Sequence, residues 1–349
     1  MVVYMEISIH TDQSITEGGF VLPDMPVTPQ NYQRKSFRKA TFCISAVLFA
    51  GVMMLSFNFL ISAYVYATLP SLFGESFPAS EWQEELVDIV LNLSLLLLPG
   101  VFLLIIFRKN PISPFAGPLS TPRYPFLFVP MCIGALYALN FAVNMVFGDL
   151  FAPFDPVIDP SFYPTTLPGM LLYFTQVVII PAIFEEWLFR GIMLRQLIPS
   201  VGKWPAVVIS AFVFGLMHLS PATSIFAFGF GLFAGYAYIS TGSIWFGALI
   251  HMLNNAISCS VTYWSDVFAR EDVANAFGVF SLLMMVFGVI SLSFYVRRAR
   301  RGDVHTRRTA EERLLPEGGE VFRATLRNPV LYLLIIVYGL LLWLFYLAY

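Results

Sequence analysis

The sequence predicts an all-α protein, a polytopic bundle of about eight or nine transmembrane helices. Of its 349 residues, 58% are hydrophobic and only 12% are charged, and the mean hydropathy is +0.73. A soluble domain carries about 25% charged residues. Several apolar runs also reach the roughly 20 residues that a helix needs to cross the hydrocarbon core of a bilayer. The chain is therefore expected to be an integral membrane protein, in the cytoplasmic membrane if its host is a prokaryote.

Apolar runs bounded by charged residues, proline or glycine are the candidate spans. In chain order they cover 40–66, 86–107, 125–148, 167–197, 204–219, 221–240, 243–263, 273–296 and 329–348. The run at 204–219 is short, so it could tilt or re-enter instead of crossing. The number of spans is therefore eight or nine.

Basic residues fall on one side of this arrangement. The basic segments are 33–40, 108–124, the pair Arg195 and Lys203, and 297–308. The intervening loops are acidic or neutral, at 74–85, 149–164 and 265–272. Cytoplasmic loops of membrane proteins are enriched in Lys and Arg. The N-terminus is therefore predicted to be cytoplasmic. Residues 1–33 are polar and lack the layout of a cleavable signal peptide.

Composition also excludes some classes of function. The net charge is −2, which gives no reason to expect a nucleic-acid partner. Cys43, Cys132 and Cys259 lie in different apolar runs and form no CxxC pattern. They are interpreted as small apolar core residues, and no disulfide framework is predicted.

Ionisable side chains are rare within the spans that lie between Pro164 and Tyr263. Apart from Arg195 and Lys203 of the predicted cytoplasmic turn, they are Glu185, Glu186, Arg190, His218 and His251. An ionisable group at bilayer depth costs several kcal/mol unless it is paired or hydrated, so such groups usually have a function.

Helical rise places these groups at similar depths. Glu185 and His218 each lie about 14 residues, or roughly 21 Å, from the turn near 199–204. His251 lies about eight residues, or roughly 12 Å, into its own span, and Asn255 follows one turn later. Allowing for tilt, three helices are predicted to bring these side chains into one polar patch.

Spacing within "EEWLFR" (185–190) separates two roles. Glu186 and Arg190 are four residues apart, in the favourable order for an ion pair on one helical face. Glu185 points about 100° away and has no such partner in its helix. A carboxylate beside an imidazole can act as a general base on water. The alternatives are a buried polar network that only joins the helices, and a proton relay in a transporter.

Three motifs now resemble one family signature: "EEWLFR" (EExxxR, 185–190), "FGLMH" (FxxxH, 214–218) and "HMLNN" (HxxxN, 251–255). In this order, on successive helices, they resemble the CPBP intramembrane proteases. That family includes the type II CAAX prenyl endopeptidases and the bacterial Abi-type proteins. The resemblance covers about 165–260, less than a third of the chain, and the family's usual core has about eight spans.

The resemblance implies a glutamate-dependent endopeptidase that hydrolyses a peptide bond in a membrane-associated protein or peptide. Glu185 and His218 would activate the water, His251 and Asn255 would donate hydrogen bonds to the oxyanion, and Glu186 and Arg190 would support them. The expected partners are membrane lipid and a peptide or membrane-anchored protein. The alternative function is a non-catalytic scaffold or immunity-type protein that binds a peptide in the same cavity. We expect the site to open to the cytoplasm.

No cofactor is expected. Two histidines and a glutamate could make a three-ligand zinc site, but the sequence has no HExxH pair and the family chemistry is regarded as glutamate-dependent. Zinc is the less favoured alternative.

The chain is accordingly divided into four parts. They are a mobile cytoplasmic segment (1–39), N-terminal transmembrane helices (40–164), a CPBP-like catalytic core (165–263), and C-terminal helices (264–349) with a basic cytoplasmic loop at 297–327.

Overall fold

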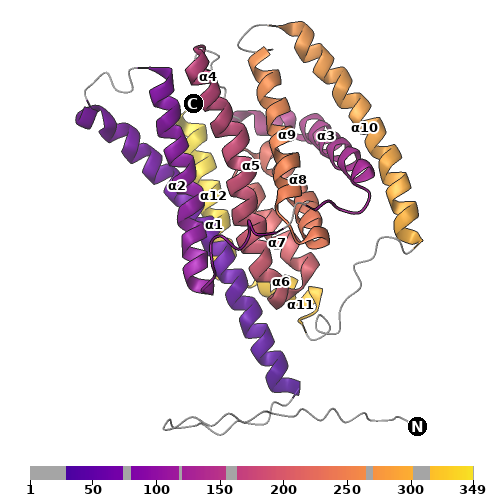
Figure 1. The fold of residues 1–349 in the computed structure, drawn as a ribbon. Coiled ribbons are helices and arrows are strands. Elements are labelled where there is room, and N and C mark those ends of the chain that lie inside the picture. Colours follow the sequence, from indigo (N-terminus) through magenta and orange to yellow (C-terminus); the bar gives the residue numbers. More distant parts are fainter. Residues whose placement is uncertain are drawn as a thin grey trace, which may run out of the picture.

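The protein is all-α, as predicted. The computed structural model describes residues 29–73, 80–117, 120–154, 163–264, 270–301 and 315–348, and none of these residues is in a β-strand. Figure 1 shows the helices side by side in a bundle, with the beginning of α1 projecting from one end.

The helices are, in order, α1 (Pro29–Phe73), α2 (Glu81–Phe107), α3 (Pro125–Phe151), η1 (Ala152–Phe154), α4 (Leu167–Phe174), η3 (Thr175–Ile179), α5 (Ile180–Glu186), η4 (Trp187–Leu194), α6 (Arg195–Val201), α7 (Lys203–Leu216), α8 (Pro221–Thr241), α9 (Trp245–Thr262), α10 (Glu271–Arg300), α11 (Gly318–Leu326) and α12 (Pro329–Ala348). The segments from α4 to α6 follow one another without a break, and η3 and η4 within them are π-helical.

Each predicted span is helical, but fewer helices than nine meet the length and hydropathy of a membrane span. Among the described residues, six helices are long and apolar enough, counting α4 to α6 as one, and seven if the bent pair of α11 and α12 is one span. The shorter α7 has only 14 residues. In α9, polar residues such as His251, Asn254 and Asn255 lower the hydropathy. The difference therefore comes from α7 and α9, which lead to candidate site residues, and from α12, which counts only together with α11.

Two segments that we expected to be mobile include helical residues. Residues 29–39 are the first turns of α1, so the helix begins well before the predicted span. Residues 318–326 of the predicted basic loop form α11, and its Val321 and Ala324 are buried. The apolar side chains on one face of α11 explain why it packs against the bundle. Residues 1–28 and 302–314 lie outside the described residues.

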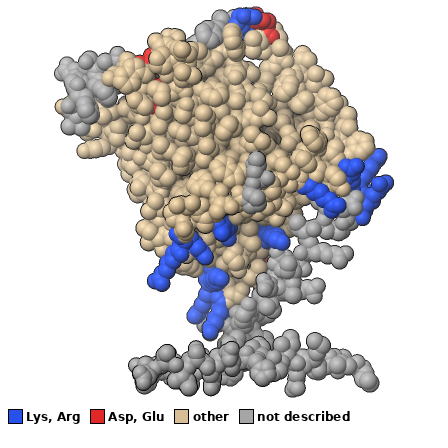
Figure 2. All heavy atoms as spheres, viewed as in Figure 1, with Lys and Arg blue, Asp and Glu red and all other residues tan. Residues whose placement is uncertain are grey.

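Charged residues separate to the two ends of the bundle (Figure 2). We call one end the basic end; α2 and α10 end there and α6 meets α7 there, so its residues include Lys109, Arg195, Lys203 and Arg300. The opposite end is the acidic end; α2 and α10 begin there, so its residues include Glu81, Glu84, Glu271 and Asp272. Arg270 also lies at the acidic end, where it forms an ion pair of 2.7 Å with Asp272. The tan band between the two ends in Figure 2 is apolar enough to lie within a bilayer.

Small residues bring α7 and α8 into close contact. A Cβ atom at Gly231 would lie 2.8 Å from the Cβ of Ala211, and one at Gly235 would lie 2.8 Å from a methyl carbon of Val207. The GxxxG spacing of these glycines is a known feature of close helix approach in lipid. The two helices form a tight hairpin, and its turn at Met217–Ser220 carries His218.

Candidate active site

The helix that carries the two glutamates departs from α geometry on both sides of them. The π-helical segments η3 and η4 precede and follow α5, which ends at Glu186. Such segments occur often at functional sites because they leave backbone groups without their usual partners. Here Pro181 has no N–H to donate to the carbonyl of Val177, four residues earlier. The side-chain amide of Asn255 donates to that carbonyl instead, at 3.0 Å. The prolyl position thus couples the glutamate helix to α9.

The predicted ion pair between Glu186 and Arg190 is present. The Arg190 guanidinium donates to Glu186 at 2.6 Å, and both side chains are almost completely buried. Arg190 also lies over the ring of Phe214, 4.6 Å from its centroid, which adds a cation–π contact. Gly247 makes room for this pair, because a Cβ atom there would lie 2.7 Å from an oxygen of Glu186. Sequence reasoning missed Gly247, since its role depends on which helix faces Glu186.

His251 lies between the two carboxylates. Its Nε2 is 3.8 Å from Glu185 Oε2, and its Nδ1 is 3.6 Å from Glu186 Oε1. Both distances exceed a hydrogen bond, so the groups are electrostatic neighbours. The Oε2 atom of Glu185 is buried and accepts no hydrogen bond. A buried carboxylate oxygen of this kind is costly unless a ligand or water satisfies it.

His218 is held by its own helix. Its Nδ1 lies 3.0 Å from the carbonyl oxygen of Phe214. A carbonyl can only accept, so Nδ1 carries the proton and the neutral ring keeps its lone pair on Nε2. His218 is therefore oriented as a base or as a hydrogen-bond acceptor.

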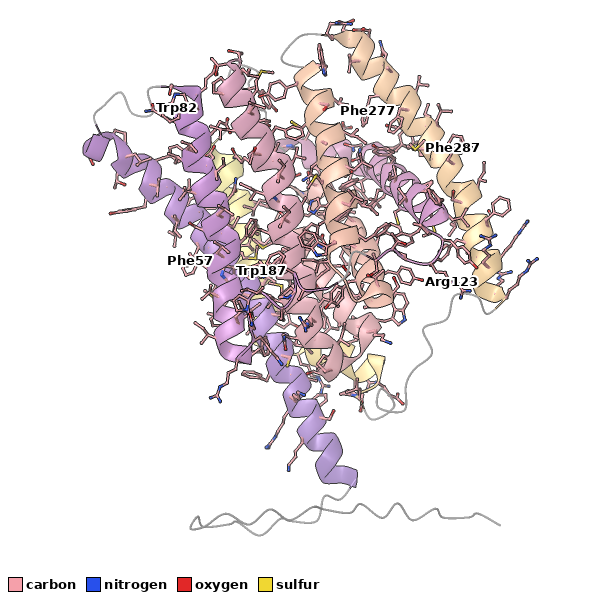
Figure 3. The ribbon with its side chains drawn as sticks, viewed as in Figure 1. Phe57, Trp82, Arg123, Trp187, Phe277 and Phe287 are labelled. Carbon is pink, nitrogen blue, oxygen red and sulfur yellow. The ribbon has the colours of Figure 1, made fainter. Side chains whose placement is uncertain are left out.

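The four candidate residues Glu185, His218, His251 and Asn255 line one cavity of about 390 Å³. A second cavity of about 1000 Å³ shares His218, His251 and Asn255 with the first and extends to α3 and α10. Phe277 of α10, labelled in Figure 3, lies on its wall. The spatial grouping inferred from helical rise is therefore confirmed, while the chemical roles stay predictions.

Residues 167–257 match the family model described as type II CAAX prenyl endopeptidase Rce1-like. This match contains all three motifs. The resemblance to the CPBP family is confirmed. It supports a CAAX protease-type family for the Rce1-like segment, which includes the glutamate helix, the α7–α8 hairpin and most of α9.

One curated relative extends the comparison beyond the family model. An Escherichia coli protein described as an uncharacterized 24.3 kDa protein is 27% identical over 129 residues, which make up 36% of this chain and 59% of that protein. The chain thus spans less than two thirds of that relative. No solved structure gives a significant match.

The smaller cavity contains polar residues that the sequence reasoning overlooked. The additional polar lining residues are Asn92, Tyr173, Gln176, Ser258 and Cys259. The Oε1 atom of Gln176 is buried and lacks a hydrogen-bond partner, as does the Oε2 atom of Glu185. The sequence does contain a signal for Gln176, because it is an amide within an apolar run. The sequence reasoning considered only ionisable groups and therefore missed it.

The positions of the His, Cys, Asp and Glu side chains also bear on metal binding. Within the part of the chain that the structure describes, no group of three or more His, Cys, Asp or Glu side chains is placed to hold a metal ion. Independence from a cofactor stays a prediction, which chelation can test.

Proposed function

We propose that this protein is an intramembrane endopeptidase that hydrolyses a peptide bond in a membrane-associated substrate with a water activated by Glu185. The observation that carries the proposal is the unpaired, buried oxygen of Glu185 in a cavity shared with two imidazoles and an amide. Glu186 also has a buried oxygen without a hydrogen-bond partner, but its other oxygen accepts from Arg190 at 2.6 Å. Glu185 lines the cavity, and Glu186 is not among the residues that line it. Glu185 therefore has the placement of a functional carboxylate.

Glu185 would take a proton from a water molecule in the cavity, and the water oxygen would attack the carbonyl carbon of the scissile bond. That proton would then pass to the leaving amine as the C–N bond breaks. His218, whose Nδ1 is held by the Phe214 carbonyl, would orient the water through Nε2. Glu186 and Arg190 would hold the local charge in place without touching the substrate.

Asn255 and His251 would stabilise the oxyanion. Asn255 uses one amide hydrogen on the Val177 carbonyl, and its Oδ1 accepts from Asn254 at 3.3 Å. These contacts fix the amide plane and leave its second N–H for the tetrahedral intermediate. A donor fixed in advance within a site that excludes water is worth several kcal/mol to the transition state.

Comparison of membrane proteomes from cells with the wild-type chain and with Glu185→Gln tests the proposal. N-terminal and C-terminal fragments that meet at one bond should accumulate only with the wild type, and His218→Ala should also lose them. Glu271→Gln is the matched control, because it neutralises an exposed glutamate at the acidic end. Equal fragments in Glu185→Gln and wild type would refute hydrolysis by Glu185.

The same variant separates catalysis from peptide binding. A non-catalytic scaffold would keep its biological effect with Glu185→Gln, provided that the variant accumulates in the membrane to the wild-type level. We expect Glu185→Gln to fail in rescuing a deletion phenotype.

A further inference from the structure

A further cavity of about 480 Å³ lies outside the candidate active site, in the half of the bundle next to the basic end. Its walls come from α3, α8 and α10, and Trp204 at the start of α7 also lines it. Among the described residues that line it, none is charged, and apart from Trp204 and two tyrosines all are apolar. Since it contains none of the candidate site residues, it needs an explanation of its own.

Close contact between α3 and α10 forms one boundary of this cavity. A Cβ atom at Gly134 would lie 2.7 Å from the Cα atom of Gly288, and both glycines line the cavity. Other lining residues are exposed, among them Ala138, Val289 and Leu292. The cavity is therefore a groove that opens on the lipid-facing surface of the bundle.

The length and polarity of the groove match one leaflet of a bilayer. Its lining residues on α10 run from Met285 to Tyr295, roughly 15 Å along the helix, about half of a hydrocarbon core of about 30 Å. Its polar groups gather at one end, where Tyr236 and Tyr295 share a hydrogen bond of 2.6 Å. The exposed ring of Trp204 stacks on Tyr236 there, with centroids 5.9 Å apart. Because Trp and Tyr are enriched at the membrane–water interface, this end lies at the level of the lipid headgroups.

Basic side chains continue the walls of the groove beyond this aromatic end. On α10, Arg298 follows Tyr295 by three residues and so lies on the same face of the helix. On α3, Tyr124 is the capping residue, one turn before Phe128, which lines the groove. The guanidinium carbons of Arg298 and Arg123 lie 4.4 and 5.5 Å from the centroid of the same Tyr124 ring. Figure 2 shows basic side chains gathered where α10 ends, and Figure 3 labels Arg123 close to that place. Two positive charges are thus held near each other at the mouth of an apolar groove.

We infer that this groove binds one molecule of an anionic phospholipid. An acyl chain would lie along the apolar walls, and the phosphate would lie between Arg123 and Arg298, because guanidinium groups match the geometry of phosphate oxygens. Basic pockets between transmembrane helices on the cytoplasmic side bind anionic headgroups, and the positive-inside rule places the basic end on that side. A second copy of the chain fits the groove less well. Inserted in the same direction, it would bring its own basic residues to the same level, and like charges repel.

The lipid would lie against one wall of the candidate site. Met285 lines both the groove and the larger cavity, and α3 and α10 contribute walls to both. Lipid binding does not depend on the proposed hydrolysis, so the two proposals fail independently.

Native mass spectrometry of the full chain, purified in detergent and delipidated, measures binding directly. The probes are phosphatidylglycerol and phosphatidylcholine with identical acyl chains. We expect one phosphatidylglycerol per chain, bound about tenfold more tightly than phosphatidylcholine, because each basic residue at the surface adds to the attraction of an anionic lipid. Glu185→Gln should give the same result. Equal affinity of the wild type for the two lipids would overturn the inference.

The double variant Arg123→Gln/Arg298→Gln should lose the preference for phosphatidylglycerol and keep its affinity for phosphatidylcholine. Lys35→Gln/Arg38→Gln is the matched control, because it removes the same charge from exposed positions on α1, which does not line the groove. Ala138→Phe places a ring in the groove and should weaken the binding of both lipids. The inference is overturned if the preference survives in the first double variant, or if the control loses it equally. A wild-type dimer that Ala138→Phe separates, with no lipid bound, would assign the groove to a second copy and also overturn it.

Discussion

Gly247→Ala tests the packing of α9 against the Glu186 carboxylate with a single added methyl group. The added Cβ would lie 2.7 Å from Oε2 and 3.3 Å from Cδ of Glu186. The carboxylate cannot swing away freely, because Arg190 holds its Oε1 at 2.6 Å and His251 Nδ1 lies 3.6 Å from the same oxygen. Forcing an extra methyl group into a filled core costs about 1–3 kcal/mol. The same shift would disturb His251, so activity should fall with stability.

Gly339→Ala is the matched control, because it lies within α12 and its added Cβ would meet nothing within 4 Å. There the exchange should be neutral or stabilising by about 0.5–1 kcal/mol, as is usual for glycine in a helix. Both variants are purified in detergent, and the fraction that stays monodisperse after heating is compared with wild type, followed by a cleavage assay. If Gly247→Ala is as stable and active as Gly339→Ala, the packing of Glu186 against α9 is not as described.

Arg190→Met leaves the Glu186 carboxylate buried and unpaired, so it should lower the free energy of unfolding by about 3–5 kcal/mol. The double variant Glu186→Met/Arg190→Met should recover part of this lost stability in the same heating assay. No recovery would contradict the interpretation that the loss comes from breaking the ion pair. Asn255→Ala should lower kcat by about 10²–10³-fold with little change in KM, because its amide acts on the transition state; steady-state kinetics that show a change in KM alone would exclude the oxyanion role. Removal of metal by a chelator should leave the cleavage rate unchanged, and a rate restored only by added zinc would reinstate the metal hypothesis.

Helical periodicity and rise were sufficient to predict much of the site. The Glu186–Arg190 pair depends only on a spacing of four residues, and its geometry in the structure agrees. Glu185 and His218 share a cavity because each lies a similar distance from the same turn. Such relations are local or involve adjacent helices, so they can be derived without knowledge of the whole bundle.

Other features depend on contacts between distant parts of the chain. The role of Gly247 needs the knowledge that α9 faces Glu186, and the bond from Asn255 to Val177 needs the register of α9 against the glutamate helix. Fewer helices meet the length and hydropathy of a membrane span than the nine predicted runs, partly because α7 is short and α9 is polar, and both of these helices lead to candidate site residues.

Hydrolysis in water enriched in ¹⁸O, with purified protein in liposomes and a substrate identified from the fragment comparison, tests the central claim most directly. The account predicts that the wild type inserts one solvent oxygen into the new carboxyl terminus, and that Glu185→Gln yields no labelled product. Labelled product from Glu185→Gln at the wild-type rate would contradict the assignment of Glu185 as the group that activates water.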